Sequence, residues 1–117
     1  MKKAIFSTEI SLLKTTIERL LRRKAGSNLT KIIRKTHPAD IAMIMRGFNI
    51  ENQKILFKLS PTFSYKAAIL EELDESLIQN LLSEESITNI SKIFRHLGTN
   101  DQAMILVCFQ KKAKIQF

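Results

Sequence analysis

The residues of this chain that could do chemistry are two histidines, one cysteine and a short acidic run. His37 stands directly before Pro38, where we expect it to cap or pack at a helix start. His96 lies near the predicted end of another helix, where a protonated imidazole is favourable. Neither histidine has a second ligand at metal-binding spacing, and nucleotide-binding, nucleophile-elbow and zinc-protease motifs are absent from the sequence. We therefore expect no enzymatic activity and no catalytic residue.

Glu71, Glu72, Asp74 and Glu75 form the acidic run, at the junction of two predicted helices. Hard cations such as Mg²⁺ take oxygen ligands, so a run of this kind can attract them. The favoured interpretation is a solvated helix end in which Asp74 caps the helix that follows. We expect no cofactor, and weak Mg²⁺ binding is the alternative.

The composition indicates one all-α domain over residues 1–117. The chain is 44% hydrophobic and 26% charged, with three Gly, two Pro and no alternating strand pattern. The single cysteine, Cys108, excludes an internal disulfide and a Cys-based zinc site, and it reads as a small core residue in the apolar run 103–109. That run is too short to span a bilayer, and polar residues 7–9 interrupt any signal-peptide core. We expect a cytoplasmic protein.

The surplus of positive charge is confined to the start of the chain. Residues 1–35 hold ten Lys and Arg and two acids, a net charge of +8, whereas residues 36–117 hold nine of each. The first predicted helix ends in Arg19, Arg22, Arg23 and Lys24. The favoured interpretation is a solvated helix end that complements the helix dipole. The alternative is contact with an acidic protein, an anionic membrane surface or, least favoured, nucleic acid.

Apolar residues recur at helical spacing along the whole chain. The first helix is predicted over residues 7–24, with Gly26 as its C-cap and with an apolar face of Phe6, Ile10, Leu13, Ile17, Leu20 and Leu21. Pro38 suits the first position of a later helix. The other predicted helix starts are marked by Ser27 or Asn28, Asn49, Ser60 before Pro61, Asp74, Ser83, and Thr99 with Gln102 as a capping box. The basic residues Lys111, Lys112 and Lys114 close the last helix.

Three segments carry a resemblance to a known family. They are residues 37–42 (HPADIA), residues 59–61 (LSP) and residues 67–74 (AAILEELD). Their order resembles the N-terminal intracellular domain of MgtE-type magnesium transporters, over residues 27–109. The resemblance implies a right-handed, armadillo-like superhelix of seven to eight short stacked helices, similar to one in the flagellar switch protein FliG. Residues 1–26 would form a basic amphipathic helix, residues 27–110 the superhelical core and residues 111–117 a basic tail.

The resemblance also implies where Mg²⁺ would bind, and this chain departs from the family there. In the transporters the N domain closes onto CBS domains when Mg²⁺ is abundant, with carboxylates from both sides holding the ions. One family Glu is replaced by Ala68, and in a second acidic segment Asn100 and Met104 stand at acidic positions, leaving Asp101. Asp101, Asn100 and Asp74 are therefore only weak candidate ligands.

Three functional hypotheses follow. The first is a non-catalytic regulatory module resembling the MgtE N domain that docks a protein partner, a membrane transporter or a copy of itself, with Arg19, Arg22, Arg23 and Lys24 as candidate contacts. The second is a direct Mg²⁺ sensor domain of a magnesium transport system. The third is a FliG-like self-assembling adaptor.

Overall fold

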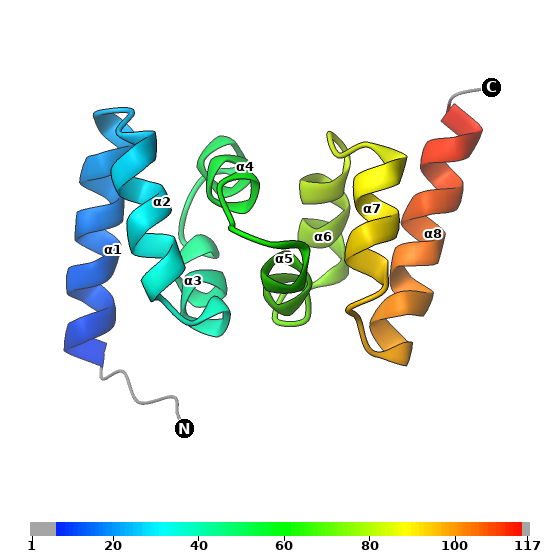
Figure 1. Cartoon of the computed structure of the whole chain (residues 1–117), viewed down its shortest axis with the longest axis horizontal. Coiled ribbons are helices and arrows are strands. Elements are labelled where there is room, and N and C mark those ends of the chain that lie inside the picture. The colour runs from blue at the N-terminus through cyan, green and yellow to red at the C-terminus, as the bar shows by residue number, and fades with distance from the viewer. Residues whose placement is uncertain (1–6, 116–117) are drawn as a thin grey trace. The chain divides into compact units, whose positions relative to one another are not determined.

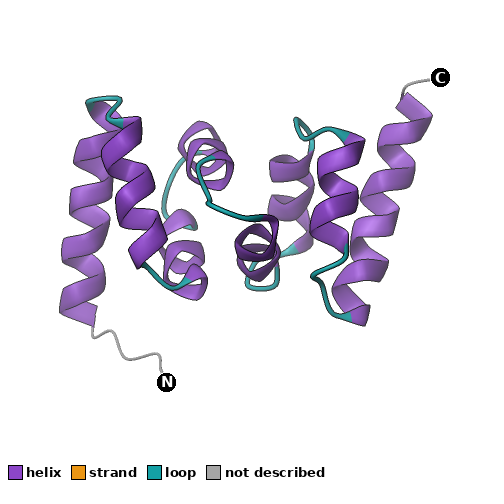
Figure 2. Cartoon of the chain, viewed as in Figure 1, coloured by secondary structure: helices purple, strands orange, loops and turns teal. Residues whose placement is uncertain are grey.

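The computed structural model describes the backbone of residues 7–115 and the side chains of residues 9–107. Residues 7–115 form eight α-helices and no strand, which confirms the predicted all-α class (Figures 1 and 2). The right-handed superhelix and the single domain stay predictions. The helices are α1 (Ser7–Arg22), α2 (Gly26–Lys35), α3 (Pro38–Met45), α4 (Ile50–Lys58), α5 (Phe63–Leu70), α6 (Glu75–Leu82), α7 (Ile87–Phe94) and α8 (Thr99–Ile115).

The helices fall into two compact units, which divide between Pro61 and Thr62. In the first unit α1 packs against α2 and α3, and α3 packs against α4. The core of this unit is mainly aliphatic, and its fully buried side chains include Ile17, Leu29, Ile33, Ile41, Met45, Leu56 and the aromatic Phe57. Burial of side chains from all four helices in one core explains why helices of eight to ten residues are stable here.

The turn between α1 and α2 is held by a backbone motif in which Lys24 adopts a left-handed conformation, with φ of 55°. The Ala25 N–H donates to the Leu20 carbonyl at 3.0 Å and the Lys24 N–H to the Leu21 carbonyl at 3.1 Å, the two bonds of a Schellman motif. The prediction that Gly26 is the C-cap was therefore wrong, because Gly26 is the first residue of α2. The predicted caps Ser27 and Asn28 were wrong for the same reason.

The second unit contains α5 to α8, with α7 packed against both α5 and α8, and α6 packed against α8. Its buried core is again aliphatic, with Ile69, Leu70, Ile78, Leu82, Ile90 and Ile93 all at most 2% exposed. Every predicted helix in this part of the chain exists. Two starts were misplaced by a few residues.

An internal repeat organises residues 37–115. Three eight-residue helices, α3, α5 and α7, begin at residues 38, 63 and 87, and each is followed by a second helix that begins at residue 50, 75 or 99. In each turn a backbone N–H returns to the last carbonyl of the first helix, from Phe48, Leu73 and Leu97 in turn. The chain therefore repeats one helical hairpin at intervals of 25 and then 24 residues, and the two-unit boundary falls between the first and second hairpins.

Side-chain caps fix where most of these helices begin. Asn49 and Asp74 accept hydrogen bonds from Asn52 N–H and Leu77 N–H, and Pro38 opens α3, all as predicted. The predicted cap Ser60 is wrong, because Thr62 caps α5 and the buried Ser60 hydroxyl donates to the Leu56 carbonyl.

The remaining corrections concern α7 and α8. Ser83 does not start α7, since Ser86 is its N-cap. The Thr99–Gln102 capping box does not form, because the Gln102 amide donates to the Phe94 carbonyl at 3.1 Å.

One predicted apolar position faces solvent, and others lie outside the described side chains. The sequence predicts that Ile55, Leu56 and Leu59 are the apolar positions of α4, but Ile55 is 42% exposed and the fully buried Phe57 was missed. The predictions for Phe6, Cys108, Lys111, Lys112 and Lys114 concern side chains outside the described residues 9–107.

Candidate functional site

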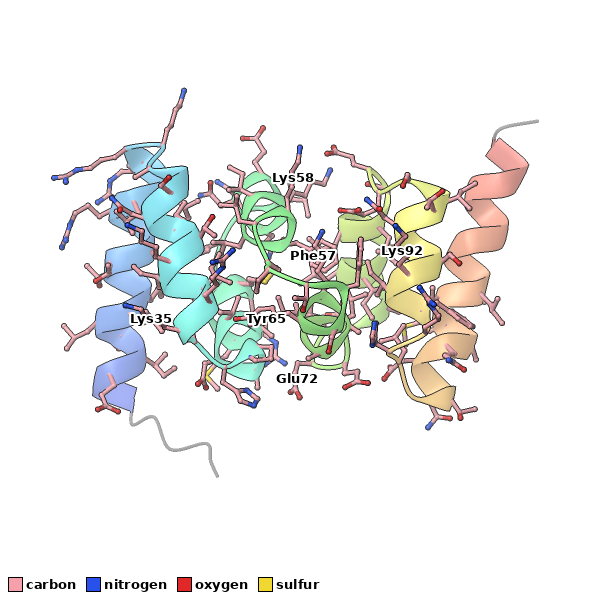
Figure 3. The ribbon with its side chains drawn as sticks, in the orientation of Figure 1. Lys35, Phe57, Lys58, Tyr65, Glu72 and Lys92 are labelled. Atoms are coloured by element: carbon pink, nitrogen blue, oxygen red, sulfur yellow. The ribbon has the colours of Figure 1, made fainter. Side chains whose placement is uncertain are left out.

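The predicted basic cluster is a solvent-exposed surface on α1 and α2. Arg19 and Arg22 lie in the last turn of α1, Arg23 and Lys24 form the turn, and all four are exposed. Helix α2, which lies beside α1, adds exposed Lys31, Arg34 and Lys35 (Figures 1 and 3). We call these seven residues the basic face.

The basic face is not neutralised within the chain. Among residues 9–107, none of its seven cations has an ion-pair partner. The acids on the same two helices are Glu9 and Glu18, against eight Lys and Arg when Lys14 is included. The Lys14 ammonium lies 6.0 Å from the centre of the Phe48 ring, where it contributes a cation–π contact. A surplus of one sign on one hairpin creates a positive field over that part of the molecule.

The acidic residues of the run 71–75 interact with other groups of the chain. Asp74 caps α6, and Glu75 accepts a hydrogen bond from the Gln79 amide at 3.2 Å. The Glu71 carboxylate accepts the Gly98 N–H at 3.4 Å, and Glu72 also has an interaction of its own. These bonds match the favoured interpretation of the run as a capped helix end.

The weak metal candidates do not converge. Asn100 and Asp101 lie in the first turn of α8, Asn100 exposed and Asp101 half-buried, whereas Asp74 has its carboxylate on the α6 backbone. Across the described side chains, no three His, Cys, Asp or Glu residues are grouped so that they could hold a metal ion. A Mg²⁺ site with several protein carboxylates is therefore not built from residues 9–107.

The histidines have separate positions. His37 is the N-cap of α3, and its Nδ1 accepts the Ala39 N–H at 3.1 Å. Of the two predicted roles, capping or packing at a helix start, His37 therefore has the first. His96 is exposed in the turn after α7.

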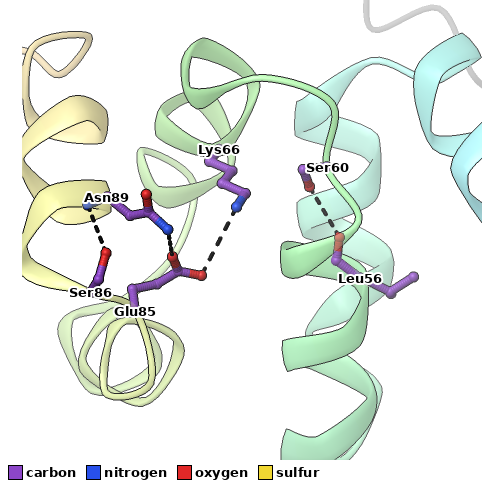
Figure 4. Close-up of polar contacts among 6 residues, drawn as sticks. All are labelled: Leu56, Ser60, Lys66, Glu85, Ser86 and Asn89. Carbon is purple, nitrogen blue, oxygen red and sulfur yellow. Dashed lines mark hydrogen bonds and ion pairs between the residues drawn. The ribbon is translucent and has the colours of Figure 1, made fainter.

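A buried ion pair in the second unit was not predicted from the sequence. Lys66 is only 8% exposed, and its ammonium lies 3.9 Å from the Glu85 carboxylate, which also accepts a hydrogen bond from the Asn89 amide at 3.1 Å (Figure 4). The equivalent positions of the other two hairpins hold Ile41 and Ile90, which are 0% and 1% exposed. A lysine at a core position of one repeat is the signal that could have located the pair.

Comparison with protein families assigns the repeated hairpins. The family model described as the MgtE intracellular N domain matches residues 36–115. This chain belongs to that family. The match begins just before the first hairpin of the repeat and ends with the last residue of α8, so the three hairpins are the MgtE N domain. No curated protein and no solved structure matches the chain.

The boundaries of the MgtE N domain separate two parts with different charge. The matched domain carries nine basic and nine acidic residues, whereas the 35 residues before it carry the whole surplus of +8. The basic face therefore lies outside the matched residues, on the hairpin of α1 and α2. The side chains of Ile17, Leu29 and Ile33 on this hairpin are part of the core of the first unit. Within residues 7–115, no helix combines the length and the apolar character needed to cross a bilayer.

Proposed function

We propose that this chain is a non-catalytic regulatory module of a magnesium transport system, and that it acts in the cytoplasm by docking a protein partner through its helical surface. The observation that carries the proposal is the match to the MgtE intracellular N domain over all three hairpins. The family description supports the intracellular location. Each hairpin contacts its neighbours within its unit through aliphatic side chains, which leaves the polar outer surfaces for binding.

The described side chains favour docking over direct ion sensing. The resemblance places Ala68 where the family has a Glu, and Ala68 is a half-buried apolar side chain that cannot bind Mg²⁺. Two residues earlier, Lys66 places a positive charge in the same helix, paired with Glu85. Asp74 is already engaged as an N-cap.

The test is Mg²⁺ transport in the native cell. We expect deletion of the chain to change the initial rate of Mg²⁺ entry, followed with a fluorescent indicator at limiting and at saturating external Mg²⁺. Expression of the wild-type chain should restore the rate. Equal entry rates with and without the chain at both concentrations would refute the proposal.

Two further measurements separate the alternatives. A rise in melting temperature with added Mg²⁺ would favour the sensor, because a ligand that binds the native state stabilises it. Growth in particle size with concentration on sizing chromatography would favour the self-assembling adaptor.

A further inference from the structure

We infer that the basic face on α1 and α2 binds the surface of an anionic phospholipid bilayer. The inference does not depend on the role in magnesium transport. It rests on the charge, exposure and hydrogen bonding of the hairpin that precedes the family domain.

The first step is the uncompensated charge. The basic face presents seven exposed cations with no ion-pair partner in residues 9–107. A repeat array needs a polar outer surface to stay soluble, but mixed charges serve that purpose equally well. A single sign is what attraction to an oppositely charged partner requires. Clusters of four to eight Lys and Arg on an amphipathic helix are typical of contact with anionic lipid.

The second step is an apolar residue in register with the cations. Leu12 is 65% exposed, the largest exposed fraction among the large apolar side chains described. It shares one stripe of α1 with Thr16 and Arg19, at i, i+4 and i+7, and Arg23 continues the stripe at i+11. The core residue Ile17 points from the opposite side of the helix, with 0% exposure. The outer stripe therefore combines an apolar side chain with arginines whose long stems can reach lipid headgroups.

The third step is that two threonine hydroxyls near Leu12 are satisfied internally. The Thr15 hydroxyl donates to the Ser11 carbonyl and the Thr16 hydroxyl to the Leu12 carbonyl, both at 3.0 Å. Hydroxyls bonded in this way lose little when the surface is moved from water to the less polar headgroup region.

The exposed surface near the cations also argues against nucleic acid. Single-stranded nucleic acid is bound by cations together with aromatic side chains on which the bases stack. On α1 and α2 the described side chains include no Phe, Tyr or Trp. Binding of duplex DNA through phosphates alone remains an outcome that the experiment detects.

The experiment is co-sedimentation of the full chain with vesicles of phosphatidylcholine alone and of phosphatidylcholine mixed with phosphatidylglycerol. We expect binding only to the mixed vesicles, and binding that weakens steeply as salt is raised. Each Lys or Arg near such a surface strengthens binding by about fivefold. Arg19→Glu combined with Arg23→Glu should therefore weaken binding by at least about 25-fold.

The matched control reverses the same number of charges elsewhere. Lys58 and Arg95 are exposed and lie outside the basic face, so Lys58→Glu with Arg95→Glu lowers the net charge equally. This control should weaken binding by no more than about threefold, through screened long-range attraction. Leu12→Ala should weaken binding by about threefold or more, because part of an apolar side chain is no longer buried among lipid. Far-UV circular dichroism checks that every variant is folded.

Three results would overturn the inference. The first is equal binding to both kinds of vesicle. The second is an equal loss from the patch variant and the control variant, which would show that net charge alone acts. The third is binding to duplex DNA or to polyglutamate in the absence of binding to anionic vesicles.

Discussion

The ion pair between Lys66 and Glu85 makes a quantitative prediction about stability. Their side chains are only 11% and 13% exposed, and the two charged groups are 3.9 Å apart. At an effective dielectric constant of about 20, this separation gives a gross attraction of about 4 kcal/mol. Removing both groups from water costs several kcal/mol, so the expected net coupling is about 1–2 kcal/mol.

The perturbation is a double-mutant cycle with Lys66→Ile and Glu85→Gln. Glu85→Gln keeps an oxygen that can accept the Asn89 amide but leaves a nearly buried ammonium without this anion, and we expect a loss of about 2 kcal/mol. Lys66→Ile introduces the residue found at the equivalent positions 41 and 90 but leaves the nearly buried Glu85 carboxylate with only the Asn89 amide, and should cost about 1 kcal/mol or more. The double variant should lie within about 1 kcal/mol of wild type, because it removes both charges together.

The assay can be confined to the unit that holds the pair. The chain has one tyrosine, Tyr65, and no tryptophan, so intrinsic fluorescence in urea reports on α5. Lys92 provides the matched control. The ammonium groups of Lys92 and Lys66 lie 5.5 Å and 5.6 Å from the centre of the same Phe63 ring, but Lys92 is exposed whereas Lys66 is buried. Lys92→Met should change stability by about 1 kcal/mol or less. A coupling free energy below about 0.5 kcal/mol, or a double variant as unstable as Glu85→Gln, would refute the reasoning.

Three further predictions concern the rest of the chain. Lys24→Gly should raise the unfolding free energy, measured by circular dichroism in urea, by about 0.5–1 kcal/mol, because glycine adopts the left-handed conformation without strain; unchanged or lower stability would contradict this. Gln53→Glu should lower it by about 2 kcal/mol, because it replaces the buried amide that donates to the Met45 carbonyl at 2.9 Å with an acceptor; a Gln53→Glu variant as stable as wild type would contradict this. Millimolar Mg²⁺ should leave the melting temperature unchanged relative to Na⁺ of equal ionic strength, because Asp74 is engaged as a cap and no described cluster holds a metal ion; a reproducible rise would contradict this.

Local chemistry explains which parts of the fold were predictable from the sequence. Pro38, Asn49 and Asp74 each begin a helix through properties of a single side chain, and all three were predicted correctly. The errors at Ser60 and Ser83 arose because several hydroxyl residues stand close together in those segments. Thr62 and Ser86 are the caps, because their hydroxyls accept the N–H groups of Tyr65 and Asn89. Sequence spacing alone does not choose among neighbouring hydroxyl residues.

The repeat was missed for a related reason. Its three hairpins share a backbone pattern and few residue identities, so the period of 25 and 24 residues emerges only when helix starts are known. Two of the hairpins share one side-chain feature. Gln53 and Gln102 are each the fourth residue of their helix, and each amide donates to the last carbonyl of the preceding eight-residue helix. The same position in the middle hairpin is Ile78, which is buried.

The charge distribution along the chain was fully predictable from the sequence. The structure adds that the seven cations of the basic face are exposed on α1, α2 and the turn between them. Surplus charge spread over the MgtE N domain would have implied only solubility, but that domain is neutral and the surplus lies on the hairpin before it. Because α1 and α2 share a core with α3, reversing the exposed Arg19 and Arg23 leaves that core intact. The proposed membrane binding and the proposed role in magnesium transport can therefore be tested independently. A variant that loses vesicle binding while cellular Mg²⁺ entry is unchanged would assign the two activities to different parts of one chain.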